Sequence, residues 1–289
     1  MMPRIAARAP GFTLVEAIIV IMLTAIVVGM VAMFIRLPFL TQLDVKARAE
    51  LSDAADTALR RVARDVRLAL PNSVRQSGDY LELLPTKTGG RYLDEEDGVA
   101  GFPLQFEKAG LNCALTPADA ACKFSVLGAM PAAPLDIVAG DQIVVYNLGI
   151  SEASAWENNK NRATVAQVSG NEVRLSNQPF ATQNPALRSP TKRFQVVSTP
   201  VTYFCDKANR RLLRYAGYAI SAIQPTPPSG PGLQTALVVD GVENCVFSYD
   251  SLANQHTALL GMRLALRRPG AGDSGKVELY HQMHIDNTP

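Results

Sequence analysis

Glu16 is the residue of this 289-residue chain whose position most directly suggests chemistry. It is the only charged residue between Phe12 and Ile35, in a stretch that is otherwise apolar except for two threonines and one glycine. An acidic side chain at the centre of a bilayer costs about 3 kcal/mol, and less near an edge. We therefore expect Glu16 to have a cationic partner. Phe12 lies four residues earlier, so a charge placed there would be one helical turn away on the same face.

The four cysteines are the next candidates, and they allow three disulfide pairings. We favour Cys113–Cys122, which closes a short loop, and Cys205–Cys245, which joins two expected strands far apart in the sequence. The apolar N-terminus implies export or membrane insertion, and an oxidising compartment favours disulfides. A zinc site is disfavoured, because the sequence has no CxxC motif and its histidines lie far from its cysteines.

Two further patterns imitate ligand-binding motifs. The stretch GAGDSGKV, from Gly270 to Val277, resembles a phosphate-binding loop, but it lacks the Ser or Thr that would hold magnesium and leads into a strand-like pattern. His281 and His284 form HxxH, but side chains three apart on a strand point to opposite faces. His256 is isolated. We expect no phosphate or metal site here.

The sequence also gives no positive sign of a calcium site, an enzyme or a nucleic-acid partner. Asp94, Glu95, Glu96 and Asp97 lack the alternating spacing of a calcium loop, so we expect a solvated loop. No pattern of nucleophile and base is present, and we expect no enzyme and no cofactor. The net charge of +2 gives no reason to expect nucleic acid as a partner. Trp156 fits either an exposed contact or a core position.

The elements that position these residues begin with the apolar segment. Its 24 residues, from Phe12 to Ile35, would span about 36 Å as a helix, enough to cross a hydrocarbon layer of about 30 Å. A cleaved secretory signal is disfavoured, because the run is long and no A-x-A pattern closes it. A plain signal anchor leaves the carboxylate of Glu16 unexplained.

The residues GFTLVEAIIVIM resemble the signature of type IV prepilins. In that family a short basic leader, here with Arg4 and Arg8, precedes a glycine, a phenylalanine and a glutamate five residues into the mature chain. The resemblance implies that prepilin peptidase cleaves between Gly11 and Phe12 and methylates the new amine. It also implies that Glu16 of one subunit meets the Phe12 amine of the next. An unpaired buried charge costs roughly 3–5 kcal/mol more than a paired one, so Glu16 would favour assembly.

We expect an α+β, type IV pilin-like fold: a long N-terminal helix packed on an enlarged antiparallel β-sheet head. The expected segments are a leader (1–11), a hydrophobic transmembrane and assembly helix (12–36), an amphipathic stem helix (37–70) and a β-rich head (71–289). Apolar residues recur every three or four positions in the stem, where Pro38 could kink the helix and Pro71 would end it. Short runs typical of strands follow: YLELL, QIVVYNL, RFQVV and VTYFC, with hairpins in ATVAQVSGNEVRLS, FCDKANRRLLRYAGYAI and the C-terminal pair LLGMRLALRR and KVELYHQMHI.

A closer resemblance is carried by RFQVVSTPVTYFCD, RRLLRYAGYAI and ELYHQMHIDNTP. These are similar to the MshO group, minor-pilin-like assembly proteins of the mannose-sensitive haemagglutinin (MSHA) pilus. The middle of the chain, roughly 85–190, matches no pattern of the group. Met33 stands where major pilins usually carry a proline, which favours a minor pilin or pseudopilin that helps to initiate or cap a filament. The alternatives are a tip adhesin or DNA-binding minor pilin, and pseudopilin J of type II secretion.

The resemblance implies a bacterial inner-membrane protein with one span and its head in the periplasm, incorporated into a pilus or pseudopilus after assembly. Its expected partners are prepilin peptidase, other minor pilins, the major pilin, the inner-membrane assembly platform and membrane lipid. Charge alone does not orient the span, because Arg4 and Arg8 precede it while Arg36, Lys46 and Arg48 follow it.

Overall fold

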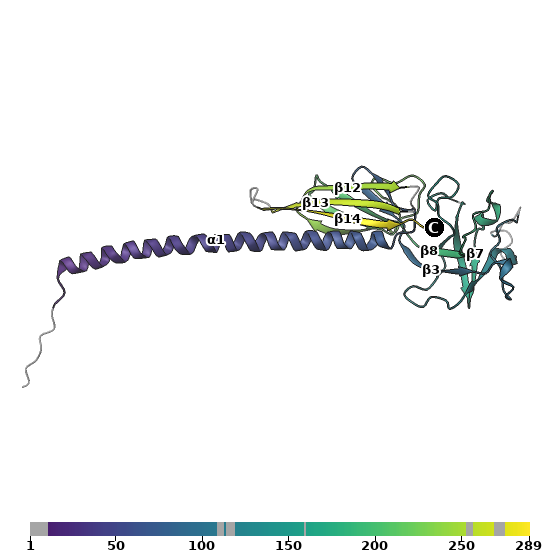
Figure 1. Ribbon diagram of the computed structural model, residues 1–289, viewed down its shortest axis with the longest axis horizontal. Coiled ribbons are helices and arrows are strands. Elements are labelled where there is room, and N and C mark those ends of the chain that lie inside the picture. Colours follow the sequence, from purple (N-terminus) through teal and green to yellow (C-terminus); the bar gives the residue numbers. More distant parts are fainter. Residues whose placement is uncertain (1–10, 109–112, 114–118, 159, 253–256, 269–274) are drawn as a thin grey trace, which may run out of the picture.

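The computed structural model describes residues 11–108, 113, 119–158, 160–252, 257–268 and 275–289. A long N-terminal helix leads into a largely antiparallel β region, so the fold is α+β (Figure 1). The first half of the helix projects away from the rest of the molecule, and its second half lies along the sheets.

The helix α1 (Leu14–Arg67) is continuous over 54 residues. Thr13 caps its N-terminus, because its side chain accepts a hydrogen bond from the Glu16 backbone N–H at 3.3 Å. Pro38 lies inside the helix without interrupting it. Apolar and amphipathic segments therefore form one rod rather than two elements.

The end of α1 differs from the expected stem boundary at residue 70. The helix ends at Arg67, three residues earlier, and Pro71 is not its terminator. The backbone N–H of Leu70 donates to the carbonyl of Leu84 at 2.7 Å, and that of Thr86 donates to the carbonyl of Leu68 at 2.7 Å. Because the backbone groups of Leu68 and Leu70 bond to the segment around Leu84, the helix ends before Pro71.

The second half of α1 shares one core with two antiparallel sheets, and we call this assembly the stem unit. Ala58, Val62 and Val66 of α1 are buried in it, and Leu51 is partly buried. The five-stranded sheet has the order β1-β2-β9-β10-β11, and the three-stranded sheet the order β12-β13-β14. Their bounds are β1 (Arg75–Ser77), β2 (Tyr80–Leu83), β9 (Val201–Asp206), β10 (Arg211–Ala216), β11 (Gln234–Asp240), β12 (Val242–Leu252), β13 (Thr257–Arg267) and β14 (Lys276–Asp286).

A closed six-stranded barrel is inserted between β2 and β9. Its order is β3-β4-β7-β6-β5-β8, and it lies beyond the C-terminal end of α1 (Figure 1). Gly90 leaves room for Phe194 at the barrel wall, since a Cβ at Gly90 would lie 2.9 Å from that ring and something would have to shift. The strands are β3 (Thr86–Tyr92), β4 (Lys123–Leu127), β5 (Gln142–Val144), β6 (Arg162–Ser169), β7 (Glu172–Leu175) and β8 (Arg193–Val197), and short 3-10 turns occupy Glu95–Asp97, Ala120–Cys122 and Pro179–Thr182.

The stem unit and the barrel meet at a third cluster of buried side chains. Trp156 is 6 % exposed and packs there with neighbours from both units. Its indole N–H donates to the carbonyl of Ser73 at 3.0 Å, and the guanidinium of Arg75 lies 3.7 Å from its ring centroid. Of the two positions that the sequence allowed for Trp156, the structure shows the core position.

The predicted hairpins are confirmed. The turn at Gly170 joins β6 to β7, and β9 pairs with β10. β13 pairs with β14 along their whole length. The expectation of one β-sheet head over 71–289 is too simple, because this region contains two hydrophobic cores and a barrel that closes on itself.

Candidate assembly surface

The first half of α1 presents an uncovered apolar surface. From Leu14 to Phe34 its mean hydropathy is 2.9, and none of this span is buried. It is the single helix in the described part of the chain that is long and apolar enough to cross a membrane. A membrane anchor and an export signal both have this character.

Phe12 and Glu16 lie at the tip of this helix. Phe12 is 71 % exposed and precedes the first helical residue. Glu16 is exposed in the first turn, where the positive end of the helix dipole favours a carboxylate. No ion pair to Glu16 occurs among the residues that the structure describes. The carboxylate of Glu16 is therefore accessible from solvent.

Gly11, at the predicted cleavage site, is exposed and lies outside any helix or strand. Accessible segments outside regular secondary structure are the ones that proteases most readily cleave. The basic leader with Arg4 and Arg8 falls outside the described residues.

Both favoured disulfides are present in the structure. Cys113–Cys122 has a Cα–Cα distance of 5.5 Å, and Cys205–Cys245 one of 5.7 Å. The second bond joins β9 to β12, so it ties the two sheets of the stem unit together inside their common core. Disulfides agree with an extracytoplasmic β region.

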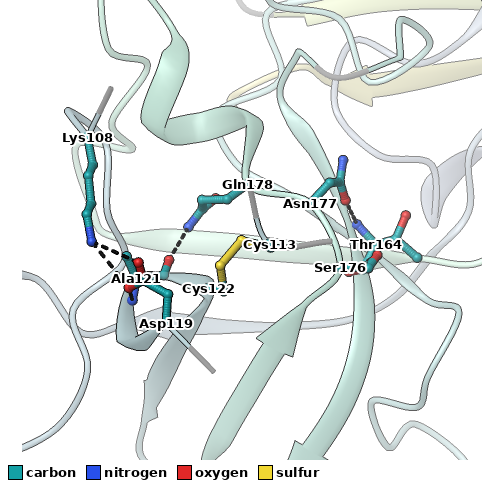
Figure 2. Close-up of a disulfide and its surroundings, with 9 residues drawn as sticks. All are labelled: Lys108, Cys113, Asp119, Ala121, Cys122, Thr164, Ser176, Asn177 and Gln178. Atoms are coloured by element: carbon teal, nitrogen blue, oxygen red, sulfur yellow. Dashed lines mark hydrogen bonds and ion pairs between the residues drawn. A yellow bond between two sulfur atoms is a disulfide. The ribbon is translucent and has the colours of Figure 1, made fainter. Parts of the chain in front are cut away.

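Cys113–Cys122 closes a loop at the barrel wall (Figure 2). Asp119 organises the chain next to it. Its carboxylate accepts from the backbone N–H of Ala121 at 2.8 Å and pairs with Lys108 at 3.2 Å. The first bond and then the second hold the pKa of Asp119 below its ordinary value. Gln178 donates to the carbonyl of Ala121 at 3.3 Å.

The remaining motif-like residues that the structure describes lie on or next to β14. His281 and His284 point to opposite faces of β14, with only His281 on the side of the stem core. Lys276 begins a strand rather than a helix, as expected for a hairpin. His256 and the loop residues 269–274 lie outside the described part of the chain. Among the described residues no group of histidine, cysteine and acidic side chains could hold a metal ion.

Two residues of the acidic run from Asp94 to Asp97 form ion pairs. Asp97 pairs with Lys192 at 2.7 Å, and Asp94 pairs with Arg188 at 3.5 Å. Asp94 and Asp97 also form a capping box around the short turn Glu95–Asp97. Their oxygens are therefore used locally. Glu95 and Glu96 are exposed, as expected for a solvated loop, but Asp94 is buried, so that expectation is wrong for this residue.

A buried polar network beside the cluster around Trp156 was not predicted from the sequence. Glu82 has no exposed surface; it accepts from the Arg75 guanidinium at 2.6 Å and from the Tyr218 hydroxyl at 2.6 Å. Arg75 also donates to the carbonyls of Ser221 and Ala222. Arg75 and Glu82 face each other across the β1–β2 hairpin, and the short spacing of opposite charges was the available signal.

No known protein family, curated protein or solved structure matches this chain.

Proposed function

We propose that this protein is a type IV pilin-like subunit, in particular a minor pilin or pseudopilin that helps to initiate or cap an MSHA-type filament. The observation that carries the proposal is the uncovered apolar helix with Gly11, Phe12 and Glu16 at its tip. In this account prepilin peptidase cleaves after Gly11 and leaves a cationic, methylated amine on Phe12.

Assembly then uses the exposed carboxylate of Glu16. Within a bundle of apolar helices, water is excluded and an unpaired charge is costly. The Phe12 amine of a neighbouring subunit removes this cost in one register of the helices. The other apolar side chains of α1 would contribute burial that does not depend on register.

The same surface suits the inner membrane before assembly, with one span and the β region in the periplasm. The partners in this proposal are prepilin peptidase, other minor pilins, the major pilin, the assembly platform and lipid. The protein acts here as a structural subunit, without a cofactor and without catalysis of its own.

The test is Glu16→Val in the native host. We expect the variant to be processed and to fold, but to be absent from sheared filaments or to reduce filament number. Glu96→Val, which removes an exposed carboxylate from the barrel, is the matched control and should behave as the unmodified chain. Normal incorporation of the Glu16→Val chain would contradict the proposal.

The inserted barrel favours a second candidate, a binding module displayed by the filament. It lies at the end of the molecule opposite the apolar tip (Figure 1). A cleft of about 370 Å³ on its surface is lined in part by Ile150, Lys160 and Leu187. Glycan-array binding by the full chain in detergent, lost in Ile150→Asp, would support this candidate, and an array without binding would remove it.

A further inference from the structure

A cleft of about 350 Å³ lies where the barrel meets the last residues of the chain. One wall is the outer face of β8, with Arg193 and Gln195, and the other wall contains Thr288 and Pro289, which follow β14. The C-terminus lies beside β8 in Figure 1. We call this opening the β8 cleft. It shares no lining residue with the cleft around Ile150.

The second wall is held in place by the protein itself. Asn287 is buried, and its side-chain oxygen and its carbonyl accept from the backbone N–H and the side-chain amide of Asn72, each at 3.0 Å. Asp286 is the acidic member of the lining, and its carboxylate accepts from the backbone N–H of Thr288 at 2.9 Å. The cleft is therefore formed before any ligand enters it.

Two arginines oppose each other on the barrel side. Arg91 of β3 is the ladder partner of Arg193 of β8, and both side chains are exposed. Cross-strand partners lie on one face with Cβ atoms about 5 Å apart, where like charges destabilise the sheet. Neither arginine forms an ion pair within the described part of the chain. Asp97 attracts Arg91 at longer range, but its carboxylate is bonded to Lys192 at 2.7 Å.

The amide of Gln195 is also unused by the fold. It makes no hydrogen bond to a described residue, and its Oε1 is buried without a partner. Such an acceptor costs free energy that an incoming donor would recover. Because no bond holds the amide, it can turn towards the cleft, and its ladder partner Gly89 has no side chain to obstruct it.

The cleft also has an apolar part. Tyr146 follows β5 with a φ of 50°, and its half-buried ring packs against the barrel core and lines the cleft. Pro190 lies on the rim next to Thr191. An aromatic ring offers an apolar face and a polar tip. The cleft thus combines positive charge, hydrogen-bonding groups and one apolar surface.

We propose that the β8 cleft binds a sugar acid, a ring that carries a carboxylate next to hydroxyl groups. The planar guanidinium of Arg193 matches the two carboxylate oxygens, and Arg91 adds the second positive charge. Ligand hydroxyls both donate and accept, so they suit the amide of Gln195 and the hydroxyls of Thr191 and Thr288. The C–H face of the ring would cover Tyr146.

Other small ligands fit these groups less well. A bare phosphate or sulfate would neutralise the arginines but offers no donor to Gln195 Oε1. A neutral sugar would supply donors and leave the two arginines repelling each other. The volume is at the lower end for small-molecule sites, so it suits one free ring or the end of an acidic polysaccharide. This binding role goes beyond assembly through the tip of α1.

Calorimetric titration of the full chain in detergent micelles at low salt tests the proposal. We expect glucuronate to bind at least about 10-fold more tightly than glucose or inorganic phosphate, since hydrogen bonds to charged groups are the strong ones. An oligogalacturonate separates the two sources of a sugar acid. Tighter binding than that of the single ring identifies a polysaccharide, and equal binding identifies the free sugar acid.

Two variants test the roles of the arginines. Arg193→Lys keeps the charge but loses the planar fork, and it should bind glucuronate about 10-fold more weakly. Arg91→Gln should weaken binding about 3- to 10-fold without lowering the midpoint of denaturant unfolding, because it also removes the like-charge contact. Arg174→Gln is the matched control. Arg174 lies on β7, away from β8 in the barrel order, and its loss should leave the affinity unchanged.

Three results would overturn the proposal. They are no binding of glucuronate at millimolar concentrations, binding of glucose or phosphate as tight as that of glucuronate, and unchanged affinity in Arg193→Lys or Arg91→Gln. Processing after Gly11 and the dependence of filament incorporation on Glu16 are measured separately. A negative titration would therefore leave the proposed function standing.

Discussion

Glu82 shows how a single buried charge is held in this protein. Arg75 and Tyr218 both contact its carboxylate at 2.6 Å. The side chain of Arg75 is itself only 20 % exposed and lies against Trp156. A buried charge of this kind depends on its partner, because removing one member leaves the other without compensation.

Arg75→Met should therefore destabilise the protein by about 3–5 kcal/mol at neutral pH. Denaturant unfolding would measure the loss. Arg60→Met is the matched control, since the Arg60–Asp56 pair is exposed on α1 and such pairs contribute about 0–1 kcal/mol. Equal losses in the two variants would show that the buried carboxylate is not held by Arg75.

The same variant should show a defined dependence on pH. Burial raises the pKa of Glu82 above its ordinary value, and the bonds from Tyr218 and Arg75 oppose this rise. A group with a raised folded-state pKa stabilises fully below its unfolded pKa of about 4.3 and loses that contribution as pH rises. Without Arg75 the pKa rises further, so the stability gap to the unmodified chain should grow from pH 4 to pH 7. A gap independent of pH would contradict this.

Some functional residues can be recognised in the sequence and others cannot, for a physical reason. Gly11, Phe12, Glu16 and the cysteines are recognisable because local spacing or pairing chemistry restricts them. The network around Glu82 is not, because Tyr218 comes from a position 136 residues away. The role of Glu16 in assembly stays a prediction.

At the scale of elements, local patterns predicted the helix and the hairpins but not the barrel. Apolar residues that recur every three or four positions predicted the stem part of α1, and Gly170 predicted a hairpin turn. Closure of the barrel depends on β8 pairing with both β3 and β5. These pairings join distant segments, and nothing in the local pattern of β8 selects its partners.

The two disulfides should differ in their contribution to stability. Cys205–Cys245 closes a separation of 40 residues and Cys113–Cys122 one of 9. Chain entropy predicts a loss of about 4 kcal/mol when the first pair is replaced by alanine and about 2.5 kcal/mol for the second. Denaturant unfolding of the two double variants compares them directly. A larger loss for the short loop would contradict the entropic account.

At the scale of the whole molecule, two cores meet at one joint. The stem unit and the barrel each bury their own hydrophobic cluster, and Trp156 belongs to the small cluster between them. Cooperative unfolding of the whole β region then depends on this joint, since it is where burial couples the two units.

Trp156→Ala should separate the unfolding of the two units. We expect calorimetry to show two transitions where the unmodified chain shows one, with a loss of about 3–5 kcal/mol from the truncated aromatic side chain. Phe180→Ala is the control, because Phe180 is buried wholly within the barrel core. A single transition in the Trp156→Ala chain would show that other contacts couple the units.

In the proposed function, processing turns the exposed helix tip into a charged assembly site. Mass spectrometry of the protein isolated from its native host tests this most directly. We expect a chain that begins at Phe12 and carries a methyl group on its amine. A chain that retains Met1 or Met2 and has an unmodified Phe12 would contradict it, and would leave a protein anchored by its first helix.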